Sequence, residues 1–341
     1  YDNAPVAGSN PADPIPRHFW RGFFLYKLYF NVQKFHIYDP KELQSGVFQS
    51  AWSCVPFDEK HISSKPILNN SYHPIGDLST ITTVNAESCE YFIVPYYIRH
   101  THHMKDNDGF KEHLEQNLPY FSKYPEKHIF FVGSDDNRPI ACLEKSIKFA
   151  FSTKKNTNDI PIYYQPIIPV PVKPSRIELA NFDVSFQGYM CNDVRKRMAK
   201  AVLSSNLKKV VINTRYWFQK FMRHDTTVVE RNYAGLIQMS KFILCPRGFG
   251  TSSVRFYETL AYGRIPILIS DETKMPLEDK INYDEFVIRV RENELDSIEE
   301  KIRKCTNIIE KSQKARETWE KWFSPRKFDF FLQESLNSSC K

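Results

Sequence analysis

The fold is decided by the stretch SKFILCPRGFGTSSVRFYETLAYGRIPILI, which comprises residues 240–269. Its apolar residues 242–245 predict a strand, and a turn with two glycines follows them. The pattern from Ser253 to Tyr262 predicts a helix, and residues 265–269 form a second apolar strand. A strand, a helix and a strand of this kind make one crossover unit of a parallel sheet.

The same alternation continues on both sides of this stretch. Upstream, it predicts a strand at 184–186, a helix at 194–203, a strand at 210–212 and a helix at 228–239. Downstream, the spacing of isoleucines and Trp319 predicts one long amphipathic helix over residues 294–323. Apolar strands that alternate with amphipathic helices predict a doubly wound α/β sheet.

A separate α/β region lies nearer the start of the chain. Apolar runs predict strands at 91–95 and 128–132, and a helix is expected between them from Phe110 to Tyr124. Five prolines between residues 160 and 174 exclude a central strand or helix and mark a domain junction. We therefore predict an extended lead-in over residues 1–17, a domain over 18–165, a second domain over 166–323 and a tail over 324–341.

The composition is that of an ordinary globular protein. A chain of 341 residues exceeds what one hydrophobic core usually organises, and its hydrophobic and charged contents are 41% and 26%. The net charge of +7 is spread along the chain, so it is a weak argument for a phosphate-bearing ligand. Zinc-finger spacings, RNP-like motifs and arginine-rich arms are absent from the sequence, so no nucleic acid is expected as a partner.

The sequence leaves the compartment and the oligomeric state open. Its apolar windows are far shorter than the roughly 20 residues of a membrane span, so no transmembrane segment is expected in this chain. The chain begins at Tyr1 without a signal-peptide pattern. It would act in the Golgi or ER lumen if it is an excised ectodomain, and otherwise in the cytoplasm of a bacterial or viral system. Seven separated cysteines leave at least one thiol free unless it pairs between chains.

The turn after the strand at 242–245 has the features of an anion site. Gly248 and Gly250 allow the backbone to turn tightly and to approach a ligand closely. Ser252 or Ser253 is placed to cap the following helix, whose N-terminus attracts phosphate. Because the Walker lysine and the Gly-x-Gly-x-x-Gly spacing are both missing, the spacing alone leaves an ordinary glycine turn as an equal alternative.

Three charged residues accompany this turn. Arg247 and Arg255 carry forked donors that suit diphosphate oxygens. Glu258 lies one helical turn after Arg255, where it either accepts hydrogen bonds from two ribose hydroxyls or forms a simple ion pair with that arginine. Gly263 is expected to end the helix as its C′ residue.

Taken together, residues 240–269 resemble the donor-site signature of the exostosin-like glycosyltransferases. Weaker similarity extends to residues 286–289, to Phe186–Gly188 with Arg195, and to the strands at 91–95 and 128–132. The resemblance implies the glycosyltransferase B fold, in which two Rossmann-like domains face each other across a cleft. It also implies transfer of a sugar from a nucleotide-sugar, with UDP as the expected nucleotide, to a glycan hydroxyl. The transfer would invert the anomeric carbon without a catalytic metal or another cofactor.

The resemblance further implies which residues contact the donor, with Arg195 as a partner of the diphosphate. By motif position these residues are Arg195, Arg247, Gly248, Gly250, Thr251, Ser252, Ser253, Arg255 and Glu258.

The catalytic base is expected in the first domain. Members of the family commonly carry a His-Asp pair after the second strand, whereas this chain has Asp135 and Asp136. We predict Asp136 as the base, although an Asp-Asp-Asn sequence after a strand is also common turn chemistry. His100, at the start of the cluster His100–His103, is the rival base, since imidazole has a suitable pKa, unless these histidines lie in an exposed loop.

Two other classes of function compete with a glycosyltransferase. One is a catalytically silent glycan-binding or complex-forming partner that retains the fold, which the intact arginine and glutamate positions argue against. The other is a phosphoryl transferase, which would need a P-loop lysine and a magnesium-binding aspartate that the sequence lacks.

Overall fold

The computed structural model describes residues 33–38, 55–56, 80–98, 107–133, 140–166, 168–213 and 227–339. Residues 34–341 form one compact unit, to which every helix and strand described below belongs. Within the described ranges, no helix is long and apolar enough to cross a membrane. The predicted lead-in over residues 1–17 lies outside the described residues.

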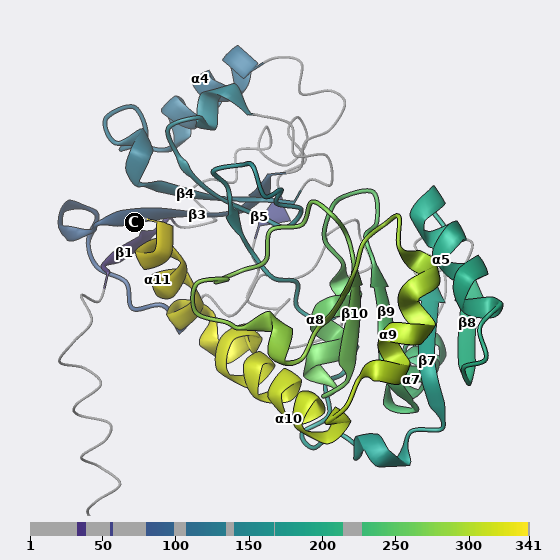
Figure 1. The fold of residues 1–341 in the computed structure, drawn as a ribbon. Helices are drawn as coiled ribbons and strands as arrows, with labels where there is room; N and C mark the ends of the chain where they lie inside the picture. Colours follow the sequence, from purple (N-terminus) through teal and green to yellow (C-terminus); the bar gives the residue numbers. More distant parts are fainter. Residues whose placement is uncertain are drawn as a thin grey trace, which may run out of the picture. The chain divides into compact units, whose positions relative to one another are not determined.

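The first sheet is built mainly from parallel strands in the order β1-β3-β4-β5-β6 (Figure 1). A further short strand, β2, pairs antiparallel with β3. Both predicted strands of this region are present, and β3 runs three residues beyond its predicted end. The strands are β1 (Phe35–Ile37), β2 (Val55–Pro56), β3 (Tyr91–Ile98), β4 (His128–Val132), β5 (Ile147–Ala150) and β6 (Ile160–Pro161).

The helix predicted over 110–124 is present as α4 (Asn107–Asn117) and is followed by a turn. Its buried residues Phe110 and Leu114 belong to the same core cluster as Phe92 and Phe130 of the first sheet. Apolar spacing therefore located the buried face of this helix correctly but placed its end too late.

The second sheet contains five parallel strands in the order β11-β10-β9-β7-β8. Four of them match predicted strands, and two parallel sheets with helices confirm the predicted α/β fold class. The strands are β7 (Phe182–Gly188), β8 (Lys209–Asn213), β9 (Ser240–Pro246), β10 (Ile265–Ile269) and β11 (Ile288–Val290).

Helices cover both faces of the second sheet. On one face, α5 (Asp193–Leu203) and α9 (Ile298–Lys304) share a core cluster with the strands. On the other face, α7 (Thr227–Gln238), α8 (Val254–Ala261) and α10 (Ile308–Thr318) contribute to a second cluster. This two-sided burial explains why β9 and β10 are almost continuously apolar.

The long helix predicted over residues 294–323 is wrong as a single element. The chain breaks between α9 and α10, where Asn307 adopts a left-handed backbone with φ of 56°. Asparagine tolerates this conformation better than most residues, so it can end one helix and start another. The amphipathic pattern of the sequence continues across this break. A π-helical turn over Trp319–Phe323 then ends the segment.

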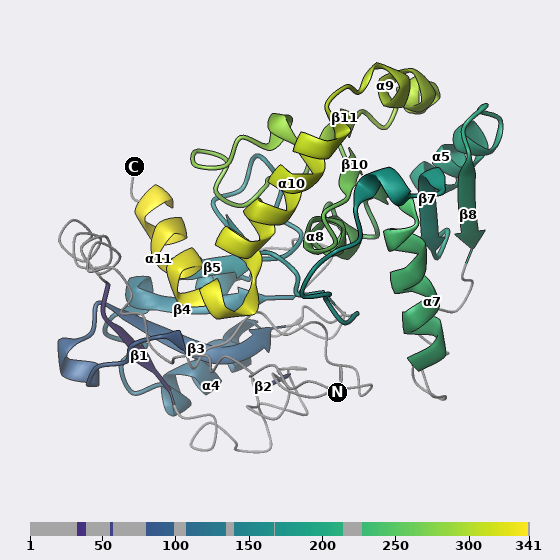
Figure 2. The same ribbon diagram turned by 90° about the horizontal axis from the view of Figure 1, so that it is seen from below.

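The C-terminal residues return to the first sheet. Helix α11 (Phe328–Ser339) lies in the region assigned to the tail, and it runs beside β4 and β5 (Figure 2). Phe328 lies 6.1 Å from Phe131, and Phe331 lies 6.5 Å from Phe149, between ring centroids. The last helix therefore completes the core of a sheet whose first strand begins 293 residues earlier in the chain.

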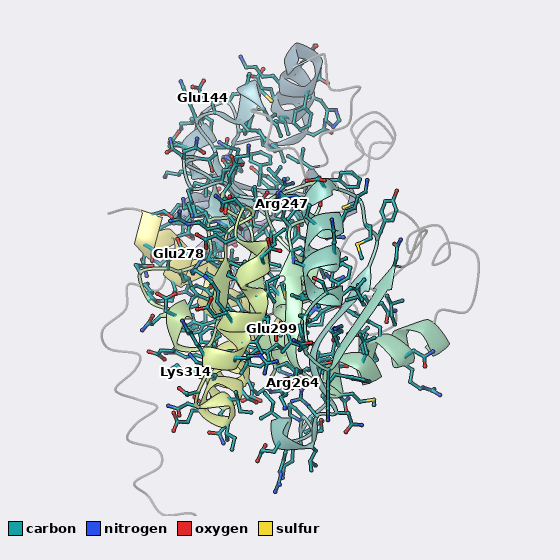
Figure 3. The ribbon with its side chains drawn as sticks, turned by 45° about the vertical axis from the view of Figure 1, so that its right-hand side comes forward. Glu144, Arg247, Arg264, Glu278, Glu299 and Lys314 are labelled. Carbon is teal, nitrogen blue, oxygen red and sulfur yellow. The ribbon has the colours of Figure 1, made fainter. Side chains whose placement is uncertain are left out.

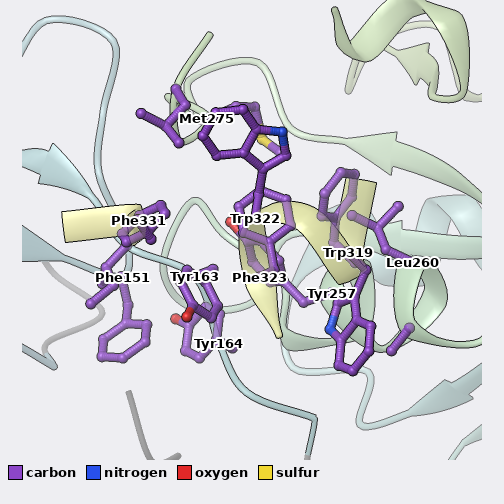
Figure 4. Close-up of a cluster of buried hydrophobic side chains, with 14 of the residues drawn as sticks. Phe151, Tyr163, Tyr164, Tyr257, Leu260, Met275, Trp319, Trp322, Phe323 and Phe331 are labelled. Atoms are coloured by element: carbon purple, nitrogen blue, oxygen red, sulfur yellow. The ribbon is translucent and has the colours of Figure 1, made fainter. Parts of the chain in front are cut away.

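One core cluster contains residues of both sheets. Figure 4 shows the part of this cluster in which Tyr163, from the connecting segment, lies with Tyr257 of α8 and Phe323 of the π-helical turn. The ring centroids of Tyr163 and Phe323 are 5.2 Å apart. The five described cysteines, Cys89, Cys142, Cys191, Cys245 and Cys305, carry free thiols.

Candidate functional site

The candidate site lies at the carboxyl ends of β7 and β9, which are adjacent in the second sheet. The chain leaves β7 for β8 on one side and later returns to β9 on the other side, so the direction of winding reverses between β7 and β9. In open α/β sheets, ligands bind at such a switch point. The turn 189–192 follows β7, and the turn 247–253 follows β9.

The side chain of Asn192 joins these two turns. Its Oδ1 accepts a hydrogen bond from the backbone N–H of Arg195 at 2.9 Å and so caps helix α5. Its Nδ2 donates to the carbonyl oxygen of Gly248 at 2.7 Å. Sequence reasoning missed this residue, although asparagine directly before a helix is a standard N-cap signal.

Arg195 lies over the same junction and holds the two turns together. Its Nε donates to the carbonyl oxygen of Arg247 at 2.9 Å, and its Nη1 donates to that of Tyr189 at 2.8 Å. A Cβ atom added at Gly248 would lie 3.4 Å from Nη2 of Arg195. A side chain at this position would therefore reach van der Waals contact with the guanidinium.

Arg247 is held by a carboxylate from a distant strand end. Its Nε donates to Oε1 of Glu292 at 2.7 Å, and this hydrogen bond raises the pKa of the guanidinium. Glu292 follows β11, and its backbone N–H donates to Oδ1 of Asp271 at 3.1 Å. No local sequence pattern pointed to Glu292, because it lies 45 residues after its partner.

Arg255 brings a third guanidinium to the end of β7. It lies in the first turn of α8, and its Nη2 donates to the carbonyl oxygen of Gln187. Its Cζ lies 4.4 Å from the ring centroid of Phe186, while the Cζ of Arg195 lies 5.8 Å from the same ring. The structure thus brings together the predicted residues Arg195, Arg247, Gly248 and Arg255.

The start of helix α8 differs in detail from the prediction. Ser253 occupies the N-cap position, as predicted, but its side chain makes no capping hydrogen bond. Thr251 is buried, and its hydroxyl donates at 3.2 Å to the carbonyl oxygen of Thr153, which follows β5 of the first sheet. At the other end, Gly263 has φ of 57°, which confirms its predicted role in ending the helix.

Of the remaining predicted residues in the turn, Gly250 is buried and Ser252 is half-buried. Both lie between the strand end and the first turn of α8, where the backbone must change direction.

Glu258 has a partner that neither of its two interpretations included. Its carboxylate is buried and accepts a 2.6 Å hydrogen bond from the hydroxyl of Tyr233, which lies on α7. Burial and the nearby carboxylate together raise the pKa of Tyr233 well above its usual value. The hydroxyl therefore stays protonated and donates to Glu258 throughout the physiological range.

The two predicted candidates for the catalytic base, Asp136 and His100, lie outside the described residues, as do Asp135 and His103. The described strands β4 and β3 end at Val132 and Ile98. In the sequence, each candidate follows one of these strand ends within a few residues, and its role stays a prediction.

Comparison with known proteins indicates the same family as the sequence motif. The family model of the exostosin GT47 domain matches residues 32–305. Exostosin-1 of Drosophila melanogaster is 34% identical over 94 residues, which cover 27% of this chain and 12% of that protein. A probable glucuronosyltransferase of Oryza sativa subsp. japonica is 40% identical over 105 residues, covering 30% of this chain and 22% of that protein. The matched stretches thus span less than a quarter of either relative.

Among solved structures, the chain is similar to TarM, with 12% sequence identity and a TM-score of 0.37. This similarity covers 68% of the present chain and 57% of that one.

Proposed function

We propose that this chain, which belongs to the exostosin GT47 family of glycosyltransferases, transfers a sugar from a UDP-sugar to a hydroxyl group of a glycan. The reaction would be a single displacement that inverts the anomeric carbon and needs no catalytic metal. Metal independence and inversion follow from the family resemblance, and UDP is the nucleotide that the resemblance favours.

One observation carries the proposal: three arginines, from the turn after β9 and from the first turns of α5 and α8, lie at the switch point of the second sheet. Arg195, Arg247 and Arg255 lie there beside the N-terminus of α8, whose first backbone N–H groups lack helical acceptors. Permanent cations and a helix N-terminus both attract a diphosphate. A donor diphosphate is therefore the ligand that this end of the sheet suits best.

The same groups would serve the chemical step. When the glycosidic bond to the donor breaks, negative charge develops on the departing diphosphate. Positively charged side chains that are already in position stabilise this charge more in the transition state than in the ground state. The acceptor hydroxyl would lose its proton to a base in the first domain, for which Asp136 remains our prediction and His100 the rival.

The nucleotide part of the proposal is tested by thermal unfolding with a panel of ligands. UDP, GDP, several UDP-sugars and UDP-glucuronate are compared, the last because the rice relative carries glucuronosyltransferase in its name. A ligand at 100 times its Kd stabilises the folded state by about 2.7 kcal/mol. We expect UDP and at least one UDP-sugar to raise the midpoint, and failure of every nucleotide would reject the proposal.

The catalytic part is tested by donor hydrolysis and by Asp136→Asn. We expect this variant to bind UDP like the wild type and to lose turnover by about 100-fold or more, the usual contribution of a general base. Unchanged turnover would move the base elsewhere, with His100→Gln as the next variant. UDP binding without hydrolysis or transfer on any donor and acceptor would instead support the catalytically silent alternative.

A further inference from the structure

We propose that Phe186 is a positioning residue of the donor site, because its ring is a shared platform on which the guanidinium groups of Arg195 and Arg255 rest. The inference builds on the proposed function, since it concerns how the donor diphosphate is recognised. The two arginines come from different helices, α5 and α8, and neither helix alone determines where its guanidinium lies.

The geometry around the ring supports this role. Phe186 is the third residue from the end of β7, and its side chain is completely buried. The guanidinium carbons of Arg255 and Arg195 lie 4.4 Å and 5.8 Å from its ring centroid, both within the range of cation–π attraction. The negative face of an aromatic ring attracts cations that would otherwise repel each other, so one ring brings two positive groups to one place.

Gly188 provides the second part of the argument. A Cβ atom at this position would lie 2.5 Å from Nη2 of Arg255 and 3.0 Å from Cζ of Phe186. A methyl group there would therefore displace the guanidinium from the ring. The strand ends in glycine because the arginine occupies the space where a side chain would lie.

The hydrogen bonds of the two arginines complete the arrangement. Arg255 donates to the carbonyl oxygen of Gln187, and Arg195 donates to those of Tyr189 and Arg247. These carbonyl groups fix the edges of the guanidinium planes, while the ring supports one face. Together, the ring and the carbonyl groups keep both guanidiniums at the carboxyl end of the sheet, where the proposed diphosphate would bind.

A purely structural role for Phe186 is the competing explanation, because this residue also belongs to the core cluster of α5 and the sheet. Phe242 is a matched control, since it is a buried phenylalanine of the same cluster on the neighbouring strand β9. Leucine at either position keeps an apolar side chain but removes the aromatic face.

The experiment measures the affinity of the 341-residue chain for UDP and for inorganic pyrophosphate by calorimetry, together with its stability in urea. We expect Phe186→Leu to weaken the binding of both ligands about tenfold, which is about 1.4 kcal/mol, and Phe186→Tyr to restore both affinities. Phe242→Leu should lose comparable stability and keep both affinities. Equal affinities for Phe186→Leu and Phe242→Leu would overturn the inference.

A second pair of variants keeps the ring of Phe186 and displaces the arginine from it. Gly188→Ala should weaken the binding of pyrophosphate about tenfold. Little stability should be lost, because the nearest atom that the new methyl group displaces is the flexible end of Arg255. Gly235→Ala, which meets no atom within 4 Å, is its control. If the wild type binds pyrophosphate but not UDP, the nucleotide proposal fails while the platform is still tested. If it binds neither, both are rejected.

Discussion

Both ends of the second sheet carry arginines, but these arginines differ in their burial and in their surroundings. Figure 3 labels one from each end: Arg247, which follows β9, and Arg264, which precedes β10. At the carboxyl end, Arg195, Arg247 and Arg255 are only partly buried. At the amino end, Arg264 is completely buried.

Arg264 is surrounded by backbone carbonyl groups. Its Nη1 donates to the carbonyl oxygen of Ser175 at 2.9 Å, and its Nη2 donates to that of Gln238 at 2.7 Å and to the hydroxyl of Ser175 at 2.6 Å. Burial lowers its pKa to about 10. The group ties the connecting segment to the end of α7, and water and ligands do not reach it.

The comparison shows that the type of residue does not determine its role. The guanidinium of Arg264 donates to backbone carbonyl groups, among them those of Gln238 and Tyr262, where α7 and α8 end and carry partial negative charge. The carboxyl-end arginines also donate to carbonyl groups, and Arg247 pairs with Glu292, but their side chains are partly exposed and lie near the beginnings of α5 and α8. Partly exposed cations beside partially positive helix N-termini suit an anion, which is why we assign a ligand to one end only.

The largest effect is expected from breaking the amino end. Arg264→Ala leaves several buried carbonyl groups without a donor, and we expect a loss of about 4 kcal/mol in the free energy of unfolding. Urea denaturation measures this loss, and the exposed Arg303→Ala is the control, with an expected loss below about 0.5 kcal/mol. If Arg264→Ala instead kept its stability and bound UDP more weakly, Arg264 would belong to a ligand site and the comparison would be wrong.

The second prediction concerns the pKa of a buried histidine in the first sheet. His128 is completely buried, and its Nδ1–H donates to the carbonyl oxygen of Tyr124 at 2.8 Å. Nε2 of the neutral ring then accepts a 2.9 Å hydrogen bond from the hydroxyl of Tyr38. Burial lowers its pKa to about 4 from the usual 6.5.

Because the unfolded chain binds the proton first, His128 contributes stability that is fully present above about pH 6.5 and is lost as the pH falls towards 4. The loss amounts to about 3 kcal/mol. We expect His128→Gln to show a flatter dependence of unfolding free energy on pH in this window. Parallel curves for the two proteins would contradict the assignment.

The third prediction concerns the carboxyl end. Arg255→Ala should weaken UDP binding by about 2 kcal/mol, or roughly 30-fold, because hydrogen bonds to charged groups contribute about 1.5–3 kcal/mol. The unfolding free energy should change by less than about 1 kcal/mol, since the side chain is partly exposed. A large stability loss with unchanged affinity would place Arg255 in the same class as Arg264.

The smallest effect is expected at the carboxylate that pairs with Arg247. Glu292→Gln keeps an acceptor for Nε but removes a negative charge near the proposed diphosphate. We expect UDP to bind about threefold more tightly at low salt, with the gain disappearing at high salt as screening increases. Glu294→Gln, at an exposed ion pair, is the control. Weaker binding at every salt concentration would mean that the charge of Glu292 is needed to hold Arg247.

The parts predicted well from the sequence are those with a local physical cause. Strands β9 and β10 are apolar because both faces of the sheet are covered, and Gly263 ends α8 because its φ is positive. The prediction of a single long helix over 294–323 was wrong, because a left-handed asparagine interrupts the helix without changing the amphipathic pattern.

The sequence by itself determined the α/β class, the glycine turn and the presence of two arginines around it, since these depend on neighbours within one turn or one strand. The tertiary structure decided the partners: Glu292 for Arg247, Tyr233 for Glu258, and the ring of Phe186 beneath two guanidiniums. Such partners come from separate strands and helices, and only the order of strands in the sheet brings them together. For the same reason, Arg264 and Arg255 look alike in the sequence and differ in the fold.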